Sequence, residues 1–370
     1  MSNNGPLPSK RMFEQAVIDS MLHQVAIIDP HGTVQATNQA WDRFCIDNKG
    51  NPNRCGIGMN YFQVSQTQTI AGIQKVLTGA ADSYTEEYPC HSPEEKRWFI
   101  LTATPLKTEN ETGEIEGAVI THLNITERKL LELEQEKELE LAKSLQQSVL
   151  HPPLQTGDLE IAGLYLPSRQ LSGDMYAWYQ IDEHQFGVIL LDIMGHGVSS
   201  GLVSMGIRSL LQGIITRAVQ PSDVYQELNK HFKHLFGVDD ESIVHYCTGI
   251  YALIDLRERS IHYFNAGNPS GLLLGGEEAA ALNKRTIPIG LREDPQVNCG
   301  TVTFKGGQQL ILYTDGLADS LKMSLNECES FLKTVWTEKF KELNERSLAE
   351  DLQMKFDQVD DISIVAIQFK

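Results

Sequence analysis

A highly charged segment without glycine or proline divides the chain into two parts. Residues 127–143 read ERKLLELEQEKELELAK, and ten of these seventeen residues are charged. Leucine, glutamate and lysine favour helix, so the segment predicts a long exposed helix. Pro152 and Pro153 end it, because proline lacks a backbone N–H and restricts the residue before it. We therefore expect one folded unit on each side of this helix.

The same helix has an incomplete heptad pattern. Leu131, Ala142, Leu145 and Val149 fall on one a/d seam, which polar residues interrupt. We expect the helix to pair with a second copy in a coiled coil, so that the chain is a homodimer through this helix and the unit before it. A solvated single connector helix stays open as the alternative.

The composition is that of a soluble globular protein. Hydrophobic residues make up 41% of the 370 residues, and the formal net charge is −18. The length fits two or three domains. Direct binding of nucleic acid is not expected, because it normally needs clustered Lys and Arg. Since the sequence has no apolar run of about 18 residues and no signal-peptide pattern at its start, we expect no membrane span and a cytoplasmic location.

The six cysteines are scattered and form no CxxC pair. In a cytosolic chain we expect all six to be free thiols, with no zinc site.

Residues 12–124 read as a compact α/β unit. A short amphipathic helix precedes two strand-like runs around an Asp-Pro-His-Gly turn, and RWFILTATPLK and GAVITHLNIT form a late hairpin. The order of IIDPHGTVQATNQAW, GIGMNYF, EEYPCHSPEEKRWF and GAVITHLNITERK resembles a PAS sensor domain, a small sheet wrapped by helices. We expect this domain at 12–126 and a signalling helix or coiled-coil linker at 127–151.

The ligand of this unit stays unknown at this stage. The sequence has GIGMNYF where a cysteinyl-flavin photosensor would need its GxNCRFLQ motif, which disfavours that chemistry. His23, His91 and His122 are possible haem ligands, but a hydrogen-bonded structural role is favoured for each. Asn38 is expected to anchor a turn.

Four small acidic motifs in the second half each lie at the end of a strand-like run. GVILLDIMGHG contains Asp192, LILYTDG contains Asp315, VDDISIV begins with Asp360 and Asp361, and SGDMY contains Asp174. Carboxylates brought together repel each other and resist ionisation unless cations offset their charge. Mg²⁺ and Mn²⁺ prefer such oxygen ligands. The pattern predicts a site for two divalent ions, which can lower the pKa of a shared water and direct it at phosphorus.

The second half carries a further resemblance. AKSLQQSVLHP, LPSRQLSGDMY, LDIMGHGVSSGL, TGIYALIDLRERSIHYFNAGNPSGLLL, IPIGL, LILYTDGLADS and VDDISIV resemble the bacterial metal-dependent PPM-type serine/threonine phosphatases of the SpoIIE and RsbU class. The resemblance covers about 140 to 370 and implies a phosphatase domain at 157–370. This domain would be a β-sandwich flanked by helices with metals at one end, and the chain as a whole would be α+β.

The resemblance also assigns roles to the acidic residues. Asp174, Asp192, Asp315 and Asp360 would bind two Mn²⁺ or Mg²⁺ ions, and the carbonyl of Ile193 would add an oxygen. Asp192 would bridge both ions and take part in catalysis.

The resemblance also suggests roles for His196, Arg169 and Asp361, and two of these residues have an alternative interpretation. His196 would protonate the leaving alkoxide as a general acid, or cap the following helix. Arg169 would bind the substrate phosphate, or be a surface arginine. Asp361 would orient a metal-bound water or a ligand.

Ala177 and Asn268 depart from the class, where an acid and a histidine are common at these positions. Because neither residue is a predicted metal ligand, we expect an active enzyme.

The sequence therefore predicts a sensor-regulated, metal-dependent phosphatase. The resemblance implies a phosphoserine or phosphothreonine substrate on a regulatory partner, namely a STAS-type anti-sigma-factor antagonist. The alternative is a non-catalytic PAS and coiled-coil signalling scaffold with a degenerate phosphatase domain. A nucleotide cyclase is disfavoured, because the TDG and DD motifs have no place in it. Two helices are expected at 222–245 and 322–357, without identifiable chemistry.

Overall fold

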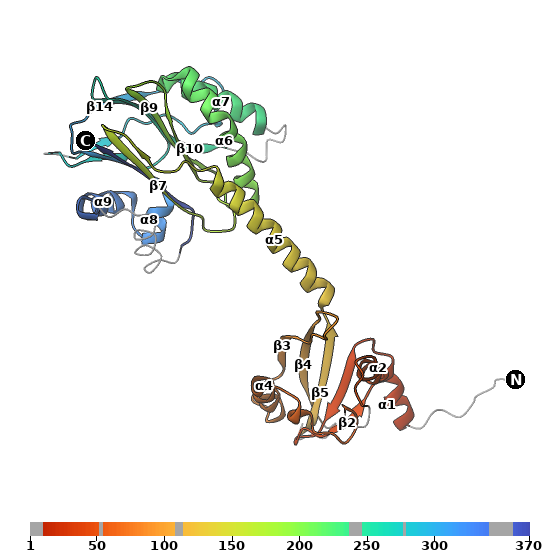
Figure 1. The fold of residues 1–370 in the computed structure, drawn as a ribbon. Coiled ribbons are helices and arrows are strands. Elements are labelled where there is room, and N and C mark those ends of the chain that lie inside the picture. The colour runs from red at the N-terminus through yellow and green to blue at the C-terminus, as the bar shows by residue number, and fades with distance from the viewer. Residues whose placement is uncertain (1–9, 52–54, 108–113, 237–245, 277–278, 340–357) are drawn as a thin grey trace. The chain divides into compact units, whose positions relative to one another are not determined.

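The chain forms two compact units in its computed structural model (Figure 1). The structure describes residues 10–51, 55–107, 114–236, 246–276, 279–339 and 358–370. The units comprise residues 1–136 and 137–370, and the division between them lies inside the helix α5 (Thr126–Ser148). This arrangement confirms the predicted helix in the middle of the chain.

The N-terminal unit is built on one antiparallel sheet. Its elements are α1 (Lys10–Asp19), β1 (Gln24–Ile28), β2 (Val34–Thr37), α2 (Gln39–Asp47), the 3-10 helix η1 (Tyr61–Gln63), α4 (Thr67–Leu77), β3 (Tyr84–Pro89), β4 (Trp98–Lys107) and β5 (Ile115–Asn124). The strand order is β2-β1-β5-β4-β3, so the first and last strands of the unit pair in the middle of the sheet.

The core of this unit lies against one face of the sheet. Phe99, Leu101 and Ala103 alternate with less buried residues along β4, as expected for a strand with one covered face. Ile73 and Val76 of α4 join the same apolar cluster. Burial of these side chains fixes the register of β4, because a shift of one residue would turn them to the other face.

Asn38 connects several segments at the start of α2, as the sequence predicts for a turn anchor. Its Oδ1 accepts hydrogen bonds from the backbone N–H of Val25 and of Trp41, both at 3.0 Å. Its Nδ2 donates to the carbonyl oxygens of Ile18 and His23 at 3.1 and 2.9 Å. The side chain is fully buried, so these contacts satisfy backbone groups that water does not reach.

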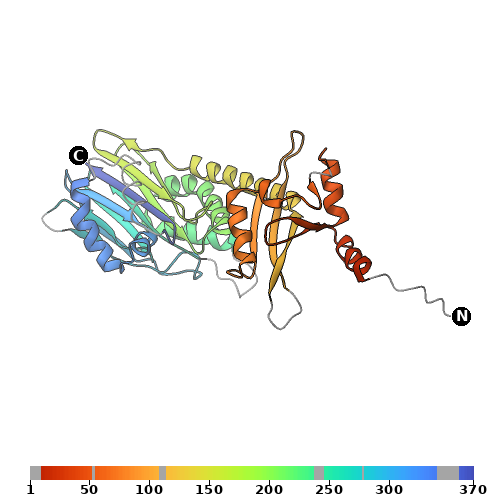
Figure 2. The same ribbon diagram turned by 90° about the horizontal axis from the view of Figure 1, so that it is seen from below.

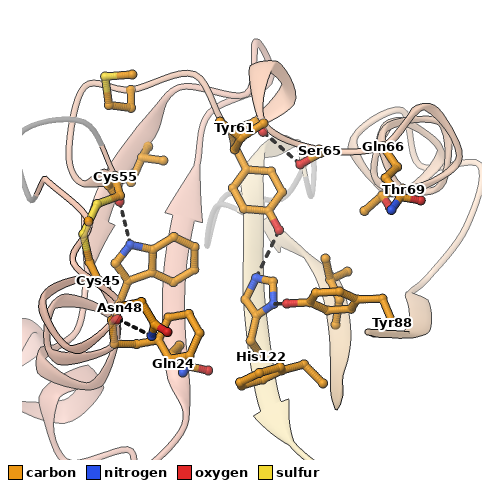
Figure 3. Close-up of a pocket in the computed structure, with 18 of the residues that line it drawn as sticks. Gln24, Cys45, Asn48, Cys55, Tyr61, Ser65, Gln66, Thr69, Tyr88 and His122 are labelled. Atoms are coloured by element: carbon orange, nitrogen blue, oxygen red, sulfur yellow. Dashed lines mark hydrogen bonds between the residues drawn. A yellow bond between two sulfur atoms is a disulfide. The ribbon is translucent and has the colours of Figure 1, made fainter. Parts of the chain in front are cut away.

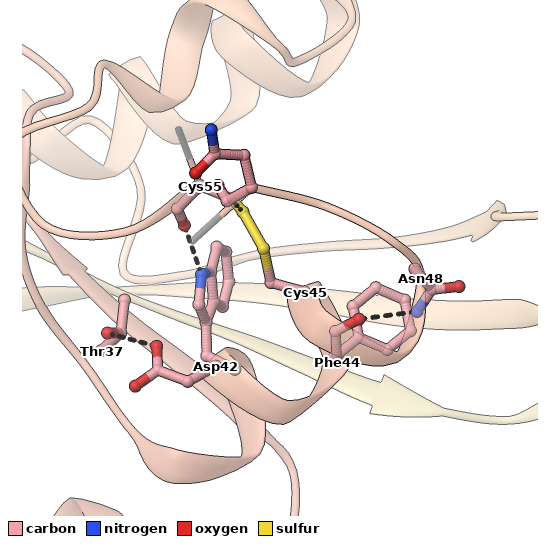
Figure 4. The surroundings of a disulfide bond; sticks show 8 residues. Thr37, Asp42, Phe44, Cys45, Asn48 and Cys55 are labelled. Carbon is pink, nitrogen blue, oxygen red and sulfur yellow. Dashed lines mark hydrogen bonds between the residues drawn. A yellow bond between two sulfur atoms is a disulfide. The ribbon is translucent and has the colours of Figure 1, made fainter. Parts of the chain in front are cut away.

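Cys45 and Cys55 form a disulfide, so the prediction of six free thiols is wrong (Figure 4). The chain turns back directly after α2, where Gly50 N–H donates to the Cys45 carbonyl at 2.8 Å. This turn brings Cys55 next to Cys45, and the indole N–H of Trp41 donates to the Cys55 carbonyl at 2.6 Å. The free cysteines are Cys90, Cys247, Cys299 and Cys328.

The helix α5 begins on the N-terminal unit. Arg128 and Lys129 in its first turn both pair with Glu87 of β3, with Lys129 Nζ 2.8 Å from the carboxylate. Most of the helix is exposed. Its pairing with a second copy in a coiled coil stays a prediction.

The C-terminal unit contains two antiparallel sheets with helices on their outer faces (Figures 1 and 2). Its elements are β6 (Leu154–Gln155), β7 (Leu159–Leu166), β8 (Met175–Gln180), β9 (Gln185–Ile193), α6 (Val198–Ala218), α7 (Pro221–Phe236), β10 (Cys247–Asp255), β11 (Ser260–Ala266), β12 (Gly271–Leu274), β13 (Ala280–Leu282), β14 (Cys299–Thr303), β15 (Gln309–Tyr313), α8 (Gly316–Leu321), α9 (Leu325–Lys339) and β16 (Ile362–Phe369). The strand orders are β14-β11-β10-β9-β8 and β13-β12-β15-β16-β7-β6.

Three apolar clusters hold these layers together. One lies between the two sheets, a second joins α6 and α7 to the sheet of β9 and β10, and a third joins α8 and α9 to the sheet of β15 and β16. The predicted sandwich flanked by helices is thereby confirmed. The predicted helices at 222–245 and 322–357 correspond to α7 and α9, while 237–245 and 340–357 lie outside the described residues.

Among the described residues, α6 is long and apolar enough to cross a membrane by length and composition. Its Val203, Ile207 and Leu211 pack in the cluster against β8 and β9. This packing is that of a core helix.

Substitution of Asn38 by alanine tests the anchoring role. We expect it to lower the free energy of unfolding of the N-terminal unit by about 3 kcal/mol, because buried backbone donors and acceptors lose their partner. The matched control is Asn48→Ala, which loses one bond to the Phe44 carbonyl at a partly exposed position and is expected to cost less than about 1 kcal/mol. Urea denaturation measures both, and equal losses would contradict the anchoring role.

Candidate active site

Four of the predicted aspartates lie at one end of the two sheets. Asp174 directly precedes β8, Asp192 is the second-last residue of β9, Asp315 directly precedes α8, and Asp360 lies two residues before β16. In the antiparallel pair of β8 and β9, Met175 lies opposite Leu191, so the start of β8 lies beside the end of β9. The structure therefore brings together carboxylates that are far apart in the sequence: Asp174 and Asp360 are 186 positions apart.

The carboxylates are close enough to affect one another's ionisation. Burial raises the pKa of Asp192 to about 7, and the charges of Asp315 and Asp360 add to this effect. Burial also raises the pKa of Asp174, with the charge of Asp192 as the next cause. The pKa values of Asp315 and Asp360 are raised first by burial and then by neighbouring carboxylates. Such a group gains stability from any cation that offsets its charge.

Asp174 is held by two hydroxyl groups that the sequence did not single out. Thr314 Oγ1 donates to Asp174 Oδ2 at 2.8 Å, and Asp174 N–H donates to Ser172 Oγ at 3.0 Å. Thr314 is fully buried. These contacts fix the orientation of a carboxylate that is itself only 2% exposed.

Asp192 has a similar partner on the neighbouring strand. Thr248 lies opposite Asp192 in the pairing of β9 with β10, and its Oγ1 donates to Asp192 Oδ2 at 3.1 Å. The other oxygen, Oδ1, has no protein donor among the described hydrogen bonds.

Asp361 binds several protein donors. Its Oδ1 accepts from the N–H and the hydroxyl of Ser168 at 2.7 and 2.8 Å, and its Oδ2 accepts from Gly173 N–H at 3.0 Å. Both oxygens thus bind protein donors. Asp361 therefore positions the loop that carries Asp174, and its expected role in orienting a water or a ligand stays a prediction.

Gly173 lets this loop approach the end of β9 closely. A Cβ atom at this position would lie 2.6 Å from the carbonyl oxygen of Ile193 and 3.1 Å from that of Gly195. Because both are rigid backbone atoms, a side chain at Gly173 is not tolerated without movement. The Ile193 carbonyl therefore lies against the loop of Asp174.

His196 and Arg169 lie at the exposed rim of the site. Burial raises the pKa of Asp360, and the nearby His196 acts in the opposite direction. Helix α6 begins after Gly197 without a side-chain cap, so His196 does not cap it. The side chain of Arg169 passes 3.8 Å from the position of a Cβ on Gly197, which places it beside the start of α6.

Ala177 and Asn268, the two residues that differ from the pattern common in the phosphatase class, are both buried. Ala177 is fully buried in the apolar cluster under α6. Asn268 is buried, and its Nδ2 donates to the carbonyl oxygen of Tyr313 at 2.9 Å, two residues before Asp315. Its Oδ1 has no hydrogen-bond partner among the described residues. Asn268 thus supports the end of β15.

Gln146 of α5 is the functional residue that sequence reasoning missed most clearly. Its Nε2 donates to the carbonyl of Ser172 at 2.8 Å, and its Oε1 accepts from the Ser172 N–H at 3.1 Å and from the Tyr165 hydroxyl at 2.9 Å. Gln146 is 4% exposed in a helix that is otherwise largely exposed. The segment AKSLQQSVLHP pointed to this helix, but no sequence signal distinguishes Gln146 from Gln147.

The donor set fits a hard divalent cation, since it consists of carboxylate and carbonyl oxygens. Within the described parts of the chain, however, no three Asp, Glu, His or Cys side chains are gathered closely enough to enclose an ion. The four carboxylates are neighbours, and each has a raised pKa. In the described residues, however, they do not surround a single position where a cation could bind.

Two sheets packed face to face, helices outside and aspartates at one end define a PP2C-type fold. The solved SiaA-PP2C domain of Pseudomonas aeruginosa has this fold, with a TM-score of 0.54 and 19% sequence identity. The alignment covers 65% of this chain and 99% of that domain.

Residues 182–370, just over half of the chain, match the family described as Stage II sporulation protein E (SpoIIE). The chain belongs to the SpoIIE family. Residues 19–130 match the PAS fold, which confirms a PAS domain in the N-terminal unit.

Two curated proteins of Bacillus subtilis (strain 168) are similar to this chain. Phosphoserine phosphatase RsbP is 41% identical over 188 residues, which are 50% of this chain and 46% of RsbP. Stage II sporulation protein E is 21% identical over 202 residues, which are 54% of this chain and 24% of that protein. The chain thus spans less than half the length of each of these relatives.

Substitution of Gln146 by alanine tests its contacts with the Asp174 loop. Because Ser172 is fully buried, its N–H and carbonyl group lose their partners, and we expect the free energy of unfolding of the C-terminal unit to fall by about 3 kcal/mol. The matched control is Gln147→Ala at the exposed neighbouring position, expected to cost less than about 0.5 kcal/mol. Urea denaturation and hydrogen exchange at residues 172–174 provide the measurement; unchanged exchange in Gln146→Ala would contradict the role.

Proposed function

We propose that this protein is a sensor-regulated, metal-dependent serine/threonine phosphatase that hydrolyses phosphoserine or phosphothreonine on a regulatory partner. The observation that carries the proposal is the convergence of Asp174, Asp192, Asp315 and Asp360 at one end of a SpoIIE-family domain. The 41% identity to a phosphoserine phosphatase supports the same activity.

The proposed cofactors are two Mn²⁺ or Mg²⁺ ions, held by these four aspartates and the carbonyl oxygen of Ile193, with Asp192 as the shared ligand. When bound, such ions supply a Lewis acid for the phosphoryl group and lower the pKa of water. The raised pKa values of Asp174 and Asp192 support this assignment, because burial and neighbouring carboxylates disfavour the charged forms and a cation would offset this effect. Thr314 and Thr248 hold Asp174 and Asp192 in one orientation.

The rim residues would act on the substrate. His196, beside Asp360 and free of a capping role, is proposed as the general acid that protonates the leaving alkoxide. Arg169, beside the start of α6, is proposed to bind the substrate phosphate, because its guanidinium can form paired hydrogen bonds with two phosphate oxygens.

The remaining parts of the proposal rest on the sequence. They are a PAS sensor at 12–126, a coiled-coil linker at 127–151 and a phosphatase domain at 157–370. They also include a homodimer through the PAS domain and linker, a phosphorylated STAS-type anti-sigma-factor antagonist as substrate, and a cytoplasmic location. The alternative is a non-catalytic scaffold, favoured by the open arrangement of the carboxylates in the described residues.

Hydrolysis of p-nitrophenyl phosphate by the full chain distinguishes the two functions. We expect activity with Mn²⁺ that is lost with a chelator, and a decrease of more than about 100-fold in Asp192→Asn and Asp315→Asn, because each removes a proposed metal ligand. The matched control is Asp158→Asn, an exposed aspartate at the opposite end of the sheet, where Lys370 N–H binds its carbonyl. Its activity should equal that of the wild type.

The same preparation is then tested with phosphorylated STAS proteins. Release of phosphate from one of them supports the proposed partner. A wild-type chain that is inert toward every substrate with Mn²⁺ would exclude the phosphatase and leave the scaffold.

Control by the sensor is tested by changing the phase of α5. Insertion of two residues after Glu136 rotates the following part of the helix by about 200°. Insertion of seven residues adds almost two full turns, so the following part changes its direction by only about 20°. We expect the two-residue insertion to change the Mn²⁺-dependent activity several-fold and the seven-residue insertion to leave it close to that of the wild type. Identical activities in both would argue against control through helix rotation.

A further inference from the structure

The N-terminal unit contains a cavity of about 520 Å³ between the sheet, α2 and the segment around η1 (Figure 3). This volume is in the range of small-molecule sites in proteins. The cavity belongs to the N-terminal unit alone, and none of the residues of the candidate active site line it.

The described part of the cavity wall carries no formally charged side chain. Among the described residues that line it, there is no Asp, Glu, Lys or Arg. The nearby Glu86 does not line the cavity, and its carboxylate accepts hydrogen bonds from Thr69 and Tyr84 at 2.7 and 2.9 Å. Arg97 lies over the Phe44 ring, with its guanidinium carbon 5.4 Å from the ring centroid, but like Glu86 it does not line the cavity. A charged molecule would lose its hydration here without a direct contact to either group, which is unfavourable. The wall therefore selects neutral molecules.

Much of the wall is formed by flat apolar rings. Trp41, Phe44 and Phe99 line the cavity, and Phe44 and Phe99 meet edge to face with their centroids 5.3 Å apart. The indole of Trp41 is held in place by its hydrogen bond to the Cys55 carbonyl, and the disulfide-bonded Cys45 and Cys55 also line the cavity. Rings fixed in this way favour a flat, largely apolar body.

One polar group stands out in this wall. His122 lies between two tyrosines, with Tyr61 Oη 3.0 Å from its Nε2 and Tyr88 Oη 2.5 Å from its Nδ1 (Figure 3). Burial lowers the pKa of His122 to about 4, so the imidazole is neutral at physiological pH. Both ring nitrogens are engaged, so His122 is not a free ligand for haem iron.

A count of hydrogens shows what this network can offer. A neutral imidazole has one N–H and each tyrosine has one O–H, which makes three hydrogens for two hydrogen bonds. In one tautomer Tyr61 donates to His122, which donates to Tyr88; in the other the direction is reversed. In either case one tyrosine retains its hydroxyl hydrogen. Tyr61 has the Ser65 hydroxyl as a further hydrogen-bond partner, whereas Tyr88 keeps its hydrogen as a donor on the cavity wall.

We propose that this cavity binds a neutral, flat and largely apolar molecule with one hydrogen-bond acceptor, such as a carbonyl oxygen, that accepts from Tyr61 or Tyr88. The uncharged lining sets the charge of the ligand, the rings set its shape, and the Tyr61–His122–Tyr88 network offers a hydrogen-bond donor to its acceptor. Further polar side chains line the cavity, namely Gln24, Asn48, Asn60, Ser65, Gln66 and Thr69. The proposal concerns binding only and does not depend on phosphatase activity.

Two probes of the same shape test the polar contact. Flavone is neutral and flat and has a carbonyl oxygen, whereas 2-phenylnaphthalene has the same outline without an acceptor. In titration calorimetry with the full chain, we expect flavone to bind about five- to tenfold more tightly than the hydrocarbon, as for one neutral hydrogen bond. Flavone with a carboxylate substituent should bind at least about tenfold more weakly than flavone.

The double variant Tyr61→Phe, Tyr88→Phe tests whether the hydroxyl groups of the Tyr61–His122–Tyr88 network cause the tighter binding of flavone. It keeps both rings but removes both hydroxyls, so we expect flavone to lose its advantage while 2-phenylnaphthalene still binds, which also shows that the cavity is folded. The matched control is Tyr84→Phe, on the same strand as Tyr88 but outside the cavity, which should retain the preference.

Three results would overturn the proposal. They are equal binding of flavone and the hydrocarbon by the wild type, undiminished preference for flavone in the double variant, and no binding of either probe up to its solubility limit. Tighter binding of the carboxylate probe than of flavone would contradict the neutral character of the site.

Discussion

The hydrogen bonds of Asp361 are the interaction on which the site depends. This carboxylate precedes the last strand, and its three bonds reach Ser168 and Gly173, about 190 positions earlier in the sequence. They tie the loop before β8, in one sheet, to the start of β16 in the other. Asp174 and Asp360, which flank this connection, are thereby held at the same end of the sandwich. Together with the Thr314–Asp174 hydrogen bond, which also joins the two sheets at this end, it holds the two halves of the acidic group in one place.

Gathering carboxylates in this way opposes folding, because burial and mutual repulsion both disfavour their charged forms. The raised pKa values of Asp174 and Asp192 express that cost. The hydroxyl groups of Thr314 and Thr248 offset part of it by donating to Asp174 and Asp192, and His196 acts on Asp360 in the same direction. A bound cation, as proposed above, would offset the remaining charge.

Much of this organisation could be predicted from the sequence. The long helix and the strand-end positions of Asp174 and Asp192 follow from local patterns of charge, alternation and glycine, whereas the PAS domain and the sandwich were implied by the resemblance of longer motifs to known families. Thr314 and Thr248 could not be found in this way, because their roles depend on register between strands that are distant in the chain. Asp361 resembles Asp360 in sequence but differs in what its oxygens contact. The Cys45–Cys55 disulfide was missed because the assumed reducing compartment decided the prediction before any geometry was known.

The burial of Gln146 also limits where recombination can join a different input domain to this output domain. The last turns of α5 belong to the C-terminal unit by their contacts, although they continue a helix that begins on the PAS domain. Recombination that joins a new input domain to this output domain must therefore cross over upstream of Lys137. A junction placed at the visible end of the helix would deliver an output domain that lacks one of its own internal supports.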